Sequence, residues 1–156
     1  MMSATTAKIA VFVLLAGLAA SANAAGDDWA GVGEALGKPG AELPGGVYKV
    51  ALPRTDLKVT LDGVELKPGF ALGSLLAFMK TGKAAMVMGD LVLTMDEVSP
   101  VMAKLVAGGI EVTTLHNHML GDAPRLFFMH FWANDDARKL ASGLKAALSH
   151  VAIAKG

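Results

Sequence analysis

Two apolar segments in the C-terminal half, residues 110–119 and 125–133, constrain the fold more than any other part of the chain. Each has the length and the aromatic or β-branched composition of a strand. Between them lies Gly121-Asp122-Ala123-Pro124, a sequence typical of a turn. We therefore predict two neighbouring strands joined by a turn.

Three of the four histidines lie in these two segments. Side chains alternate across a strand, so His116 and His118 share one face of the first strand. His130 shares a face of the second strand with Phe128 and Trp132. If the two strands pair with these faces on the same side, three imidazoles converge.

The rest of the chain predicts a sheet with helices between some of its strands. Alternation and turn signals predict further strands, and Gly89-Asp90 is expected to form a bulge or bend in the most apolar of them. The predicted strands are residues 47–52, 57–61, 64–66 and 84–93, and the predicted helices are residues 27–36, 74–79, 94–107 and 137–151. The order of these elements predicts an α+β fold: a mainly antiparallel sheet with helices packed on one face.

Residues 1–24 have the pattern of a cleaved secretory signal peptide. Lys8 supplies a positive charge, a short apolar run follows, and Ala22-Asn23-Ala24 forms a small-residue cleavage site. The apolar run is shorter than the roughly 20 residues of a spanning helix. We expect a periplasmic or secreted protein with a single domain over residues 25–156.

Charge and cysteine content narrow the classes of function. The chain has fourteen basic and fourteen acidic residues, so its net charge is zero. This balance gives no electrostatic reason to expect nucleic acid or an anionic membrane surface as a partner. The chain has no cysteine, which excludes disulfides, a thiolate metal site and a lipid anchor at a processed cysteine.

Several short motifs spread over this chain resemble the LppY/LpqO family of bacterial exported proteins, a domain of unknown function. The resemblance implies no particular activity. Members for which the family is named are lipoproteins, but their lipid anchor is not expected here, because this chain lacks the cysteine that carries it. The matching motifs are Trp29, Leu36-Gly37, Pro53-Arg54-Thr55-Asp56-Leu57, Gly89-Asp90-Leu91-Val92-Leu93-Thr94, Glu97-Val98, Pro100-Val101-Met102, Leu115-His116-Asn117-His118, Pro124-Arg125 and Met129-His130.

Imidazole is a common ligand of transition metals, and three histidines from two strands can form a site with an open position. The leading hypothesis is therefore a divalent metal, zinc by default, bound by His116, His118 and His130. Metal-assisted hydrolysis is one use of such a site. A cluster of hydrogen-bonded histidines without a ligand is the structural alternative, and an envelope module without pocket chemistry is another.

Acidic and basic residues elsewhere are candidate partners of the histidines. Asp90 follows an apolar run and is a candidate metal ligand, orienting group or general base. Arg54 is a candidate clamp for an acidic small molecule, as is Arg125, in a metal-free binder or lyase-type enzyme that uses a histidine as general base. For Glu97 we favour a role in a capping box at the start of a helix.

Methionine sulfur suits Cu(I), which raises the question of a copper site. Met119 and Met129 face away from the neighbouring histidines by strand alternation. Met86 and Met88 share a face and are expected to fill the core. The sequence therefore does not favour a copper site that contains methionine.

Overall fold

The computed structural model of the protein describes residues 23–152. The predicted signal peptide, residues 1–24, lies outside this range except for its last two residues, which begin the first helix. None of the helices in the described range is long and apolar enough to cross a membrane.

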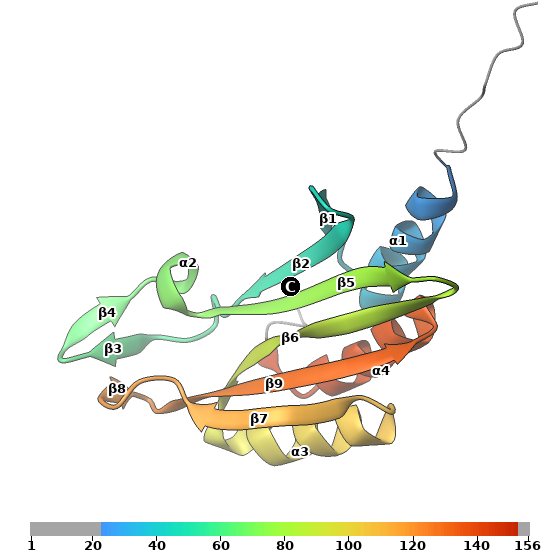
Figure 1. Ribbon diagram of the computed structural model, residues 1–156. Coiled ribbons are helices and arrows are strands. Elements are labelled where there is room, and N and C mark those ends of the chain that lie inside the picture. The colour runs from blue at the N-terminus through green and yellow to red at the C-terminus, as the bar shows by residue number, and fades with distance from the viewer. Residues whose placement is uncertain (1–22, 153–156) are drawn as a thin grey trace, which may run out of the picture.

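A six-stranded antiparallel sheet forms the centre of the described structure, with the strands in the order β1-β2-β5-β6-β9-β7 (Figure 1). Its strands are β1 (Ala41–Leu43), β2 (Val47–Pro53), β5 (Gly73–Thr81), β6 (Ala84–Thr94), β9 (Leu126–Asp135) and β7 (Glu111–Asn117). Every neighbouring pair is antiparallel.

Three helices cover one face of this sheet, as Figure 1 shows. They are α1 (Asn23–Leu36), α3 (Met95–Ala107) and α4 (Ala137–Leu148), and their apolar sides form the main core with the sheet. The predicted α+β class, with helices on one face of an antiparallel sheet, is confirmed.

A second, three-stranded sheet lies at one end of the molecule (Figure 1). Its strands lie in the order β4-β3-β8. The one-turn helix α2 follows β4 in the chain. A small separate core lies under it. These elements are β3 (Val59–Leu61), β4 (Val64–Leu66), α2 (Pro68–Ala71) and β8 (Asp122–Ala123).

Strand alternation divides the six-stranded sheet into two faces. In β6, Val87 and Leu91 are fully buried on the helix side, while Met88 on the other side is 51% exposed. We call the side away from α1, α3 and α4 the open face. The expectation that Met86 and Met88 fill the core is wrong, because both lie on the open face, away from the core that α1, α3 and α4 form with the sheet.

One predicted helix is a strand in the structure, and another helix begins earlier than predicted. Residues 74–79, predicted as a helix, belong to β5, where Leu76 and Phe78 are buried and their neighbours are not. Ser74 caps no helix, and instead its hydroxyl accepts a hydrogen bond from the Val92 N–H at 2.8 Å. The first helix begins at Asn23, before the predicted start at residue 27. Residues 74–79 form a strand because β5 pairs with β2 on one edge and with β6 on the other, which outweighs the local helical pattern of these residues.

The predicted helix starts of α3 and α4 are confirmed. Glu97 accepts a hydrogen bond from the Thr94 N–H at 2.8 Å, which completes the capping box of α3. Asp136 accepts from the Lys139 N–H at 2.8 Å and caps α4. Pro100 lies inside α3, which begins at Met95.

Gly89 is a close-packing position in a regular strand. The predicted bulge is absent, because β6 keeps an unbroken register with β5 and β9 through this point. A Cβ atom at Gly89 would lie 1.9 Å from the Leu75 carbonyl oxygen and 2.9 Å from the Phe131 ring. Glycine is therefore required here by the approach of the neighbouring backbone.

Arg54 lies just after β2 and ties this segment to β6 and to α3. It is 1% exposed. Its guanidinium donates to Asp56 (2.9 and 2.8 Å), to Glu97 (2.8 and 3.1 Å) and to the Val92 carbonyl oxygen (2.6 Å). These bonds use all five N–H donors that an arginine has. The pKa of Asp56 is lowered, chiefly by its hydrogen bonds from Arg54.

We expect Gly89→Ala to destabilise the fold by about 1–3 kcal/mol, because the new methyl group must displace backbone of β5. Urea denaturation of the two proteins measures the difference. Gly73→Ala is the matched control, since Gly73 lies in β5 and a Cβ there meets nothing within 4 Å. Equal losses in both variants would contradict the assigned role of Gly89.

We expect Asp56→Asn to cost about 1–3 kcal/mol of unfolding free energy at pH 7, because it removes a charged acceptor of Arg54. The folded-state pKa of Asp56 is lowered, so its contribution is present above the unfolded pKa of about 3.9 and is lost as the pH falls through the folded value. The difference in unfolding free energy between wild type and variant should therefore be constant near pH 7 and shrink as the pH falls below about 4. The exposed residue Glu34 provides the control, Glu34→Gln, and a pH-independent difference for Asp56→Asn would disprove the linkage.

Candidate functional site

The two histidine strands pair as predicted, as β7 and β9. The turn between them is longer than a simple hairpin, because Asp122 and Ala123 leave it to pair with β3 of the small sheet. The connection therefore joins the two sheets at the end of β7 that carries the histidines.

A β-bulge sets the face on which His116 lies. Val112 pairs with Phe131 on the core side, and Thr114 pairs with His130 on the open face, so one extra residue is inserted between them. If residues 112–116 alternated regularly with no bulge, His116 would lie on the same face as Val112. The bulge thus turns His116 to the open face, opposite Phe128 and beside His130.

His116 and His130 face each other directly. Their Nε2 atoms are 3.0 Å apart, and their ring centroids are 5.2 Å apart. The Nδ1 atom of His116 is 3.0 Å from the Asn117 carbonyl oxygen. Because a carbonyl oxygen only accepts, Nδ1 of His116 carries a proton, and in the neutral ring Nε2 holds the free lone pair.

Asp90 lies beside this pair on the adjacent strand. It is the register partner of His130, on the same open face. Its Oδ1 atom is buried and has no hydrogen-bond partner. Burial raises the pKa of Asp90, and the charges of His130 and His116 act in the opposite direction. The predicted nearness of Asp90 to these two histidines is therefore present in the structure.

His118 lies beyond the end of β7 and packs on Phe128 instead of on the other two histidines. The His118 and Phe128 ring centroids are 4.3 Å apart, while Phe128 lies 5.9 Å from His116 and 6.4 Å from His130. Phe128 is thus the common neighbour of three imidazoles. Burial lowers the pKa of His118, and the carboxylate of Asp122 opposes this shift.

Asp122 is a functional candidate that the sequence did not reveal. Its Oδ2 atom accepts from the Leu126 N–H at 3.0 Å, but its Oδ1 atom is buried without a partner. Within residues 23–152, the buried side-chain polar atoms that lack a partner belong to Asp90, His118 and Asp122. In the sequence Asp122 looks like an ordinary turn residue, and only the pairing of β8 with β3 buries it.

The side chains of His116, His130, Asp90 and His118 do not form a complete metal-coordination shell in this structure. Among the described residues, no three His, Asp or Glu side chains are placed as ligands of one ion. Two imidazole nitrogens face each other at close range, and Asp90 and His118 lie near enough to interact with them electrostatically.

The other candidate residues lie outside this pair. Arg54 is buried and fully engaged by Asp56, Glu97 and Val92, so it has no free donor for a small molecule. Glu97 completes the capping box of α3, as predicted, and its carboxylate also accepts hydrogen bonds from Arg54. Arg125 is exposed in the connection before β9.

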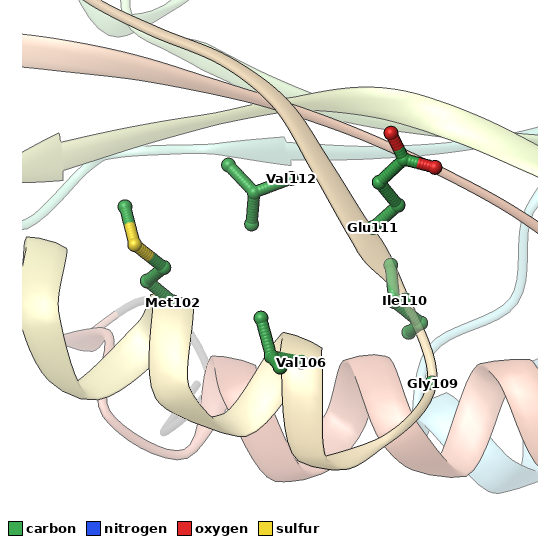
Figure 2. A pocket seen from close by; sticks show the side chains of 6 residues that line it. All are labelled: Met102, Val106, Gly109, Ile110, Glu111 and Val112. Atoms are coloured by element: carbon green, nitrogen blue, oxygen red, sulfur yellow. The ribbon is translucent and has the colours of Figure 1, made fainter.

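Two hollows border the histidines, and a third lies elsewhere. One of about 390 Å³ is lined in part by Met88, His130 and Trp132, and one of about 660 Å³ by His118, Phe128 and residues around α2. The third, of about 620 Å³, lies between α3 and the start of β7. Figure 2 shows Met102 and Val106 of α3 below Val112, with the Glu111 carboxylate turned away from them, so this hollow is apolar.

Comparison with known proteins gives a family but no activity. No curated protein matches the chain, and no solved structure matches it. A family model described as a domain of unknown function (DUF1259) matches residues 30–150, which include all of the site residues above. The match spans most of the sequence, and the chain therefore belongs to this family of domains of unknown function.

Proposed function

We propose that this protein binds a divalent transition metal through the Nε2 atoms of His116 and His130, with the carboxylate of Asp90 as third ligand. The observation that carries the proposal is the 3.0 Å separation of the two Nε2 atoms. Zinc is the default metal, because the donors are nitrogen and oxygen and no ligand tuned for redox chemistry is present.

The geometry of the histidine pair fits a metal ion. At Zn–N distances of about 2.0–2.1 Å, two ligands of a tetrahedral ion lie about 3.3 Å apart. The pair at 3.0 Å needs only a small widening to reach this value. The contact of His116 Nδ1 with the Asn117 carbonyl oxygen is the kind of interaction that orients a metal-bound imidazole.

Asp90 supplies negative charge where a cation needs it. The neighbouring strand places it opposite His130, and its Oδ1 atom has no other partner. A bound cation would satisfy this buried oxygen, which otherwise carries a desolvation cost. His118 is the alternative third ligand, in the arrangement of three histidines.

We expect tag-free protein to bind one equivalent of Zn²⁺ or Co²⁺, and His116→Ala with His130→Ala to abolish binding, because both preset nitrogens are then gone. Isothermal titration measures affinity, and the visible absorption of bound Co²⁺ reports its coordination. His150→Ala is the matched control, since His150 is exposed beyond α4. A wild type that binds no metal would refute the proposal and leave a structural module or a metal-free binder.

Two further variants identify the third ligand. Asp90→Asn should weaken binding at least tenfold, whereas His118→Ala should leave affinity nearly unchanged, because its ring packs on Phe128. The opposite result would favour the three-histidine site. Thermal denaturation without metal checks that each variant folds.

If His116, His130 and Asp90 held the metal, a fourth position would remain for water or a small molecule. A zinc-bound water can act as a nucleophile at neutral pH, so metal-assisted hydrolysis is the reaction class that such a site supports best. The alternative of a metal-free enzyme with Arg54 as substrate clamp has less support, since the five N–H donors of Arg54 are engaged within the chain.

We further propose that the chain is exported, as the resemblance to the LppY/LpqO family and the pattern of residues 1–24 suggest. Expression of the full chain in a bacterial host should yield periplasmic or secreted protein whose N-terminus is Ala25. Mass spectrometry of the recovered protein tests this expectation, and an intact Met1 terminus on cytosolic protein would contradict it.

A further inference from the structure

Three methionines occupy adjacent positions on the open face, next to the histidine pair but separate from it. Met79 of β5 and Met86 of β6 are direct register partners, and Met88 follows Met86 on the same face. Met79 is 37% exposed and Met88 is 51% exposed. We propose that these three side chains form a binding site for Cu(I), distinct from the divalent metal site proposed above.

The register brings the three sulfur atoms within reach of one ion. Directly opposed residues have Cβ atoms about 5 Å apart, and diagonal neighbours about 7–8 Å apart. Methionine has an unbranched side chain with three rotatable bonds, so the thioethers can converge above the sheet. Thioether sulfur selects Cu(I) over the harder divalent ions, and three thioethers supply a complete soft ligand set.

The choice of residue type at these positions supports a ligand role. Unbranched methionine favours helices, while exposed strand positions usually carry β-branched or aromatic residues. Packing against the main helices does not explain the choice, because α1, α3 and α4 lie on the other side of the sheet, where Met129, in contrast, is fully buried in the core. Three such departures from local preference in adjacent positions indicate function.

Trp132 borders the cluster on the side of the histidines. It is the register partner of Met88 and is 40% exposed. Met88, Trp132 and His130 line the same hollow of about 390 Å³. An indole face beside a monovalent cation adds cation–π attraction, and it also shields the ion from water.

The test is an anaerobic titration of tag-free protein with Cu(I) in competition with bicinchoninate. Wild type should withdraw one equivalent of Cu(I) from the chelator. The triple variant Met79→Leu, Met86→Leu, Met88→Leu should bind at least tenfold more weakly, because leucine keeps the volume and removes the sulfur. X-ray absorption of the complex should show sulfur neighbours around copper.

Controls separate this site from the histidine pair. Met95→Leu, at an exposed position of α3, should bind Cu(I) like wild type. The variant His116→Ala, His130→Ala should also retain Cu(I), and the triple leucine variant should retain Zn²⁺ or Co²⁺. Circular dichroism confirms that each variant is folded. Failure of wild type to compete, full retention of Cu(I) by the folded triple variant, or loss of Cu(I) only in the histidine variant would each overturn the proposal.

Discussion

The buried guanidinium of Arg54 is the interaction that holds the exit of β2 against β6 and α3. It joins the exit of β2 to the start of α3 through Glu97 and to β6 through the Val92 carbonyl oxygen. β5 and β6 cease to pair at Leu75 and Asp90, and beyond this point the polar backbone atoms of Val92 bond to Ser74 and Arg54 instead. A buried charge is tolerable only with such complete pairing, because each unpaired donor would carry the cost of desolvation.

This connection fixes the frame in which the open face lies. The small sheet covers one end of that face through its own apolar core, and the remainder carries the histidines, Asp90 and the exposed methionines. Polar and soft side chains thus collect where neither helices nor the small sheet bury the strands. The candidate metal ligands lie on the open face because ligating side chains need both a rigid backbone and access from solvent.

The sequence predicted the general architecture because its signals are local. The apolar and aromatic composition of β6 and β9, the capping box at Thr94 and the cap at Asp136 depend on residues a few positions apart. Where partners decide the outcome, the local pattern misleads. Residues 74–79 form a strand because β2 and β6 pair with both edges, and Gly89 is a contact point for Leu75 and Phe131 instead of a bend.

The sequence by itself determined that His116 and His130 lie on strands with definite faces, and that Asp90 follows an apolar run in another strand. Tertiary structure decided whether those faces coincide. The bulge between Val112 and Thr114 shifts the alternation by one residue and so brings His116 onto the face of His130. His118 lies after the end of β7, and its ring packs against Phe128. Periodicity along one strand is a property of the backbone, but register between strands depends on pairing across the fold.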